Sequence, residues 1–311
     1  MGTVRPPTSL AIDTAGRVRD PSCAVRIAVL AITGAIFAAL APGANASHVL
    51  CGDVLTADTT LDADLQCAGD GLVLTNGMSL NLNGFTIHGS GSGTGVRIVD
   101  AREVTNGRIV SFGAGISARG RSETPVSMSS LYVAYNGVGI SLDLDRFDVK
   151  VVNSVITRNQ RNGIDAGVFV SGFRIQSSLI SLNGGDGIAC SFGSGGTIEN
   201  NGIFSNGGYG VFADECVVRL IRNNASYNGN DGLFASEDSG LPQFIQAYYF
   251  EGNTANFNGA LGIRACALML FSDHPTGCAP GMTDGGGNAA TGNRDPRQCV
   301  NIRCSPHPHH P

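Results

Sequence analysis

Five side chains in the middle of the sequence could together bind a polar ligand. They are Asp143, Asp165, Phe212, Phe234 and Arg264. Exposed aromatic rings can stack against sugar rings, while carboxylates and guanidinium groups hydrogen-bond to hydroxyls or to uronic carboxylates. These residue types therefore indicate a carbohydrate-binding surface, provided that one structural element brings them to a common face.

The element that could position them is a repeat of about 22 to 24 residues. A glycine followed by an apolar residue returns after 24, 24, 23, 22 and 30 residues. The pairs are Gly139-Ile140, Gly163-Ile164, Gly187-Ile188, Gly210-Val211, Gly232-Leu233 and Gly262-Ile263. A period of this length, with short β-prone stretches between Asn-Gly-rich turns, predicts a solenoid whose coils are stabilised by stacking on one another.

Polar residues, most of them asparagines, also return once per coil, in two columns. The first contains Asn136, Asn159, Asn183, Asn206, Asn228 and Asn258. The second contains Ser130, Asn153, Ser177, Asn200, Asn223 and Asn253. Because Asn tolerates the left-handed backbone conformation, we expect turns at these positions, with amides hydrogen-bonded from coil to coil. This interpretation gives the columns a structural role.

The repeat also predicts which side chains face outward, because alternate residues of a strand point to opposite sides. If the apolar members of the pairs face in, one outward row is Ser141, Asp165, Ala189, Phe212, Phe234 and Arg264. A second outward row is Asp143, Gly167, Ser191, Asp214, Ser236 and Cys266. Between them, an inward row contains Leu142, Ala166, Cys190, Ala213, Ala235 and Ala265. An alternative for the two phenylalanines is that they pack beneath a loop formed by residues 238–250, which lengthens its coil.

Several segments resemble one known family. Cys51-Gly52-Asp53 followed by Asp64-Leu65-Gln66-Cys67 is similar to an entry coil, the stretch 80–87 (LNLNGFTI) to an internal motif, and Gly285–Asn288 with Cys299 and Cys304 to a closing segment. Together they resemble the secreted bacterial right-handed parallel β-helix proteins of the pectate-lyase-like superfamily, from Cys51 to Cys304. The resemblance implies an all-β, right-handed parallel β-helix over residues 47–304.

Two hypotheses about function follow, one from a complete repeat that carries no complete catalytic set and one from the resemblance together with a cluster of acidic and basic residues. In the first, the protein binds carbohydrate, or serves at the cell surface, without catalysis. In the second, it is a polysaccharide lyase for an acidic glycan, in which Asp143, Asp145 and Asp165 hold Ca²⁺ and Lys150 or Arg161 removes a proton. The hydrolase branch of the superfamily is excluded, because only Gly185–Ala189 faintly resembles its motifs.

The ends of the sequence indicate export. An apolar run over 27–40, preceded by arginines and followed by Ala44-Asn45-Ala46, predicts a signal peptide over 1–46, with an uncleaved anchor as the alternative. We therefore expect a secreted or cell-surface protein without a membrane span in its mature chain. The proline-rich stretch 305–311 predicts a disordered tail that could bind a metal weakly. Because charged residues make up only 14% of the chain and its net charge is −5, neither disorder nor nucleic-acid binding is expected of the rest.

Removing Cys23 with the leader leaves eight cysteines, an even number for an exported chain. Their spacing favours the disulfides Cys51–Cys67, Cys266–Cys278 and Cys299–Cys304, and a bridge between neighbouring coils from Cys190 to Cys216. Zinc ligation is the alternative, but no pair has the C-x-x-C spacing.

Overall fold

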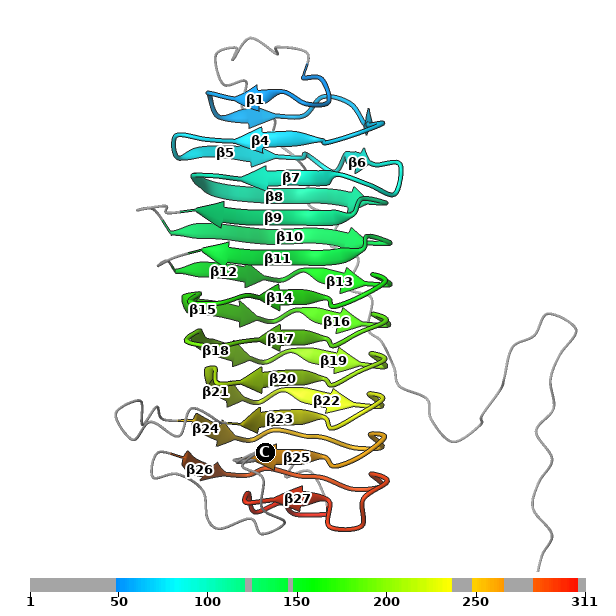
Figure 1. Ribbon diagram of the computed structural model, residues 1–311, viewed down its shortest axis with the longest axis vertical. Coiled ribbons are helices and arrows are strands. Elements are labelled where there is room, and N and C mark those ends of the chain that lie inside the picture. Colours follow the sequence, from blue (N-terminus) through cyan, green and yellow to red (C-terminus); the bar gives the residue numbers. More distant parts are fainter. Residues whose placement is uncertain (1–48, 121–124, 145–147, 237–247, 266–281, 307–311) are drawn as a thin grey trace, which may run out of the picture. The chain divides into compact units, whose positions relative to one another are not determined.

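The computed structural model describes residues 49–120, 125–144, 148–236, 248–265 and 282–306. They belong to one compact unit, Ala46–Pro311, and all regular secondary structure among them is β-strand. The strands stack as successive coils of a solenoid (Figure 1). The predicted all-β parallel solenoid is confirmed.

One strand per coil forms a parallel sheet of 11 strands, called here the first sheet. Its order follows the sequence: β1 (Val54–Leu55), β4 (Leu72–Leu74), β7 (Thr94–Ile98), β9 (Ala114–Gly120), β11 (Val138–Leu144), β14 (Ile164–Ala166), β17 (Ile188–Cys190), β20 (Val211–Asp214), β23 (Leu233–Ser236), β25 (Ile263–Ala265) and β27 (Cys299–Val300).

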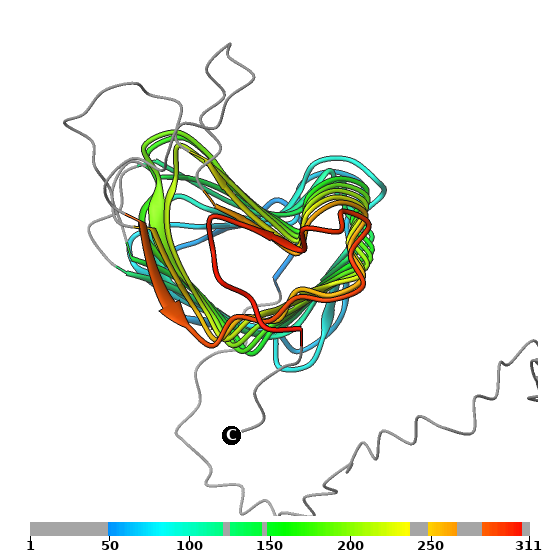
Figure 2. The same cartoon turned by 90° about the horizontal axis from the view of Figure 1, so that it is seen from below.

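The other strands form a second sheet, of 16 strands, which covers the remaining sides of each coil. They are β2 (Thr59–Thr60), β3 (Leu65–Gln66), β5 (Met78–Asn81), β6 (Thr86–His88), β8 (Ala101–Val110), β10 (Val126–Ala134), β12 (Val149–Val152), β13 (Val155–Thr157), β15 (Ser171–Gln176), β16 (Leu179–Ser181), β18 (Gly195–Glu199), β19 (Gly202–Phe204), β21 (Val217–Ile221), β22 (Asn224–Ser226), β24 (Tyr248–Glu251) and β26 (Met282–Gly286). The long strand β10 pairs with both β12 and β13, and thus joins two rows into one sheet. Seen along the stack, the coils superimpose into one closed outline (Figure 2).

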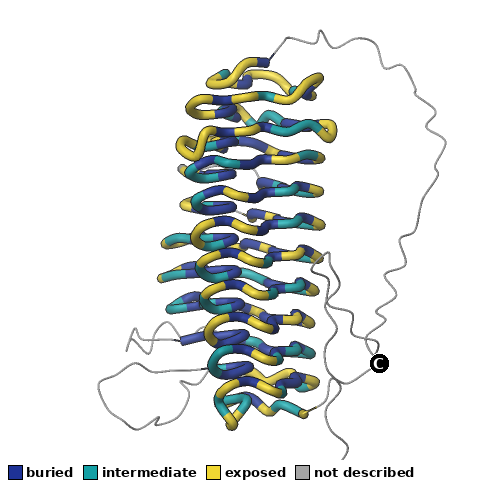
Figure 3. Tube along the Cα trace, turned by 90° about the vertical axis from the view of Figure 1, so that its right-hand side faces the viewer, coloured by how far each residue is buried: buried dark blue, intermediate teal, exposed yellow. Residues whose placement is uncertain are grey.

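The predicted register is confirmed along the first sheet. Ile140, Ile164, Ile188, Val211, Leu233 and Ile263 are paired in sequence from coil to coil, and all are fully buried. Buried residues alternate with more exposed ones along most of the solenoid (Figure 3). The inward apolar side chains of each coil pack against those of the next coil. This burial supplies the hydrophobic stabilisation that a single coil lacks.

The glycine before each of these apolar residues is required by close packing between coils. A Cβ atom at Gly187 would lie 2.6 Å from the carbonyl oxygen of Gly210 and 2.9 Å from the side-chain amide nitrogen of Asn206. Any larger residue would push neighbouring coils apart at this point. The repeated glycine is therefore required by the backbone of the next coil and by the Asn column together.

The first Asn column forms the expected ladder. Each buried amide donates to the side-chain oxygen of the next coil, from Asn136 through Asn258 to Asn293, at 2.9–3.2 Å. The expectation that these asparagines are left-handed is wrong. The positive φ angles belong to the residues just before them: Tyr135, Arg158, Leu182, Ser205, Tyr227 and Phe257. The preceding residue makes the turn, which leaves each Asn free to point inward and bond to its neighbours.

The second predicted column mixes two structural columns. Ser130, Asn153, Ser177 and Asn200 are left-handed, and their counterparts in the next two coils are Arg222 and Gly252. A separate inner ladder contains Asn201, Asn223, Asn253 and Asn288. The coil shortens to 22 residues between Asn201 and Asn223. A column predicted with a spacing of 23 residues therefore passes from Asn200, in the left-handed column, to Asn223, in the inner ladder.

Three predicted disulfides are present: Cys51–Cys67, Cys190–Cys216 and Cys299–Cys304. Cys266 and Cys278 lie outside the described residues. Ser305, expected in the tail, forms a parallel bridge with Ala289, so the solenoid continues at least to this residue. In the described part of the chain, no helix is long and apolar enough to cross a membrane.

Candidate functional site

The outward face of the first sheet presents one continuous row of side chains, called here the outer row. From coil to coil, strand pairing aligns Arg97, Ser117, Ser141, Asp165, Ala189, Phe212, Phe234 and Arg264. Every residue predicted for this row from Ser141 onward is in its predicted register. The coils at the N-terminal end add Arg97 and Ser117, which were not predicted.

A groove of about 210 Å³ lies over the N-terminal part of the outer row. We call it the arginine groove, and it is lined by Thr94, Arg97, Ala114, Ser117, Arg119, Val138, Ser141 and Arg161. Three guanidinium groups and three hydroxyls thus converge, and none of these lining residues carries a carboxylate. Guanidinium groups bind carboxylate, sulfate and phosphate oxygens through paired hydrogen bonds, so the groove can hold an anionic group.

The three arginines differ in how they are held. Asp70 accepts a hydrogen bond from Nη2 of Arg97 at 3.1 Å and another from the backbone nitrogen of Thr94 at 2.7 Å, which fixes the orientation of this guanidinium. Arg119 and Arg161 are exposed, and neither has an ion pair within the described residues. Arg161 is the predicted basic residue that the structure does bring to this face. Its charge acts to lower the pKa of Asp165.

Two half-buried carboxylates, Asp165 and Asp186, follow the groove toward the C-terminus. Burial raises the pKa of Asp165 from its ordinary value, against the effect of Arg161 and of a hydrogen bond with Asn162. Burial also raises the pKa of Asp186, and the nearby charge of Asp165 raises it further. Asp186 accepts a hydrogen bond from the backbone nitrogen of Tyr209 at 2.7 Å and thereby supports the next coil.

The aromatic rings of the outer row pack against one another. Phe212 and Phe234 stack on one another with centroids 5.2 Å apart and an interplanar angle of 6°, and Tyr209 packs against both. Only 2% of Phe234 is exposed. Coils about 4.8 Å apart place aligned rings at stacking distance, so each ring covers a face of the other. The alternative prediction of cover by residues 238–250 involves a segment largely outside the described residues.

Arg264 ends the aromatic cluster and is already paired. Its Nε lies 2.8 Å from a carboxylate oxygen of Asp231, and its guanidinium lies 5.6 Å from the ring centre of Phe234. The Asp231 side chain is fully buried, and burial raises its pKa despite the bonds with Leu261 and Arg264. At this end of the row, the Arg264 guanidinium is therefore used to hold neighbouring coils together and is less available to bind a ligand.

The predicted calcium ligands do not converge among the described residues. Asp165 is paired in register with Ser141, so Asp143 stands two positions further along the neighbouring strand. Asp145 lies outside the described residues, in which no group of three or more acidic, His or Cys side chains could hold a metal ion. Lys150 lies on the second sheet, paired with Arg174, and not on the face of Asp143 and Asp165. Lys150 and the two aspartates are therefore near in sequence but belong to different sheets.

The sequence contained a signal for Arg97 and Ser117, the two outer-row residues that were not predicted. The glycine-apolar pair also occurs at Gly71-Leu72, Gly95-Val96 and Gly115-Ile116, one to three coils before Gly139. Continuing the register through these pairs places Arg97 and Ser117 directly on the outer row.

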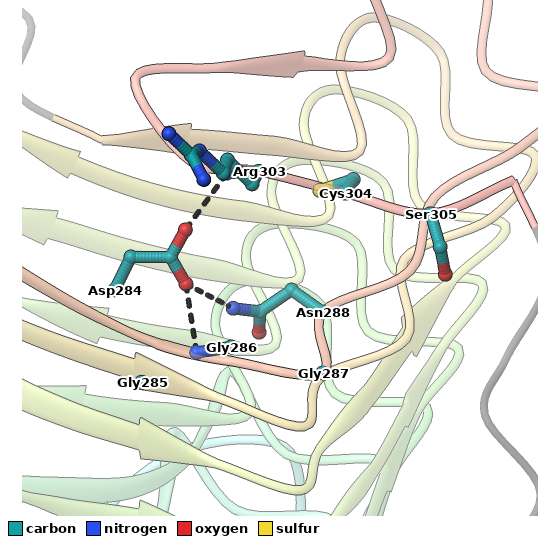
Figure 4. Close-up of a pocket in the computed structure, with 8 residues that line it drawn as sticks. All are labelled: Asp284, Gly285, Gly286, Gly287, Asn288, Arg303, Cys304 and Ser305. Carbon is teal, nitrogen blue, oxygen red and sulfur yellow. Dashed lines mark hydrogen bonds between the residues drawn. The ribbon is translucent and has the colours of Figure 1, made fainter.

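A second depression, of about 430 Å³, lies at the C-terminal end of the solenoid (Figure 4). Asp284 dominates it, but its carboxylate already accepts hydrogen bonds from the backbone nitrogens of Gly286 and Arg303 and from the Asn288 side chain, at 2.9–3.1 Å. The bond from Arg303 joins β26 to the segment after β27, while the other two are local to β26 and the residues directly after it. We interpret this depression as part of the closing structure predicted from Gly285–Asn288.

Comparisons with known proteins agree with this fold. Residues 165–267 match the family model described as "Right handed beta helix region". No curated protein sequence matches the chain significantly. The fold of the chain is a right-handed parallel β-helix, as its sequence predicted.

Two solved structures are similar to it. The Dettilon tailspike protein (gp208) shares 16% sequence identity with a TM-score of 0.44, over 79% of this chain and 53% of the tailspike chain. The pectate lyase Pel9A shares 14% identity with a TM-score of 0.44, over 81% of this chain and 72% of the lyase chain. The chain thus spans about half the length of the tailspike.

Proposed function

We propose that this protein binds an extended glycan, without catalysis, along the outer row of its first sheet. The observation that carries the proposal is the arginine groove, where guanidinium groups and hydroxyls from three consecutive strands and one following turn converge over the row. A glycan presents hydroxyls and ring oxygens at regular intervals. A solenoid face with one new side chain per coil can bind such a polymer along its length.

The residues around the groove suit binding better than the lyase mechanism. That mechanism needs a calcium site beside a base on one face, and the described residues bring only Arg161 close to Asp165. Three of its candidate groups are elsewhere or apart: Lys150 is on the second sheet, Asp143 is two positions from Asp165, and Asp145 lies outside the described residues. Binding needs only the donors and acceptors already lining the groove.

A blocking substitution tests the proposal. Ser141 is half-buried on the floor of the groove, so Ser141→Trp should fill it and abolish glycan binding measured by calorimetry. Ser127→Trp is the matched control, because Ser127 is a half-buried outward residue on the second sheet, paired with Lys150. Equal affinity in both variants would overturn the assignment of this face.

The lyase alternative has its own readout. Incubation with alginate, pectate or glycosaminoglycan and Ca²⁺ should leave absorbance near 235 nm unchanged if the protein only binds. A steady rise in this absorbance would come from unsaturated uronate formed by β-elimination. It would show that the protein is a lyase and not only a binding protein.

The proposed site of action is outside the cytoplasm. Three disulfides in the described residues, two of them closing loops of 16 and 26 residues, suit an oxidising compartment. The sequence suggests cleavage after Ala46. Mass spectrometry of the exported protein should then find an N-terminus near Ser47, whereas a retained residue 1 would favour the anchor.

A further inference from the structure

Positively and negatively charged side chains occupy neighbouring parts of the face on and beside the outer row. The arginine groove holds Arg97, Arg119 and Arg161 inside, while carboxylates stand around it. Asp70 belongs to the coil before the groove and pairs with Arg97. Asp165 belongs to the coil after it, as the register partner of Ser141.

Further carboxylates extend this pattern on both sides. Asp143 is the register partner of Arg119 and is exposed beside the groove. Asp186 lies close enough to Asp165 for their charges to interact. Beyond them come the half-buried rings of Tyr209 and Phe212, which carry no charge. Among the described residues, this part of the face therefore has one place for an anion, bordered along the stack by carboxylates and then by apolar surface.

We infer that the ligand is a heteropolysaccharide in which acidic sugars are separated by neutral ones, and not a homopolymer of uronates. This inference rests on the proposed function. An isolated carboxylate or sulfate fits among the three guanidinium groups. A second anionic sugar next to it would meet Asp165 or Asp70, and like charges at close range repel. A neutral sugar at that position instead offers hydroxyls, which can donate hydrogen bonds to the carboxylates of Asp165 and Asp186.

The experiment compares three classes of oligosaccharide of equal length by calorimetry. They are a hyaluronan oligosaccharide, which alternates uronate with neutral hexosamine, a homopolymeric oligogalacturonate, and a neutral xylan oligosaccharide. We expect the alternating ligand to bind at least about tenfold more tightly than either of the others, because one charged hydrogen-bonded contact is gained and one repulsion is avoided.

Two substitutions connect this preference to named residues. Arg119→Gln should weaken binding of the alternating ligand about tenfold, while Arg174→Gln, on the second sheet, should leave it unchanged. Asp165→Asn should improve binding of the oligogalacturonate by about fivefold or more. Glu103→Gln, which removes the same charge from the exposed surface of the second sheet, should not.

The outcomes separate the two proposals. If no oligosaccharide binds, the proposed function itself fails. If the xylan oligosaccharide binds as tightly as the alternating one and Arg119→Gln has no effect, the face binds glycans but the inference is wrong. Tighter binding of the oligogalacturonate than of the alternating ligand by the parent protein would also overturn it.

Discussion

Replacing Asn206 by Ala should destabilise the solenoid strongly, because this side chain connects three coils. Its oxygen accepts hydrogen bonds from the backbone nitrogen of Asn183 at 3.1 Å and from the Asn183 amide at 2.9 Å. Its amide donates to the side-chain oxygen of Asn228 at 3.0 Å and to the carbonyl of Ile180 at 3.2 Å. Asn206 is only 2% exposed, so water cannot replace these partners.

The magnitude follows from the groups left without partners. In Asn206→Ala, two buried donors of Asn183 lose their acceptor. Since each unsatisfied buried group costs about 1–3 kcal/mol, the free energy of unfolding should fall by about 2–6 kcal/mol. Asn230→Ala is the matched control, because Asn230 is exposed and its side chain has no hydrogen-bond partner within the described residues. It should change stability by no more than about 0.5 kcal/mol.

Urea unfolding followed by circular dichroism measures both variants. Because coils contact only their neighbours, part of the stack can unfold separately, and the slope of the transition would then change. The midpoint and the slope should therefore be compared together. If Asn206→Ala lost less than about 1 kcal/mol, or no more than Asn230→Ala, the ladder would not be the source of stability that its geometry indicates.

Three further predictions concern the first sheet and its supports. Phe234→Ala should lower the free energy of unfolding by about 3–5 kcal/mol, since it empties a buried position against Phe212. Asp186→Asn should stabilise the protein at neutral pH. Burial raises the folded pKa of Asp186 above the unfolded value, so the parent carries a penalty that disappears as pH falls through the folded pKa toward 3.8. Alanine at both Cys190 and Cys216 should cost about 3–4 kcal/mol, because this bridge closes a loop of 26 residues, and more than loss of the five-residue bridge near the C-terminus.

Each of these predictions has a contradicting result. A fully stable Phe234→Ala protein with weakened glycan binding would instead indicate that the Phe234 ring stacks against a sugar. For Asp186→Asn, a stability difference from the parent that grows as pH falls from 7 to 4 would reverse the assigned sign. For the disulfides, thermal melts showing a larger loss from the five-residue bridge would contradict the loop-length argument.

The sequence predicted the fold well because its repeat reflects packing that every coil must satisfy. The pair Gly187-Ile188 is needed wherever a coil passes the Asn ladder and fills the interior, so its spacing gave the register directly. Side chains on the surface obey no such common constraint. Lys150 is near Asp143 in sequence, yet the two residues belong to different sheets.

Interactions between neighbouring coils also limited what the sequence could predict. Phe212 and Phe234 were correctly predicted to share an outward row, but whether two aligned rings lie flat or stack depends on the spacing between coils and on Tyr209. In the same way, the sequence identified Asn206 as a ladder residue but did not show that the left-handed residue of the turn is Ser205, directly before it.

The central claim is that the outer row of the first sheet binds the glycan, and arginine footprinting tests it most directly. The protein is treated with an arginine-specific dicarbonyl reagent, with and without saturating alternating oligosaccharide, and the modified sites are identified by mass spectrometry. Arg119 and Arg161 should be protected by the ligand, while exposed Arg174 on the second sheet should react equally in both conditions. Protection of Arg174 with no protection of Arg119 or Arg161 would contradict the claim.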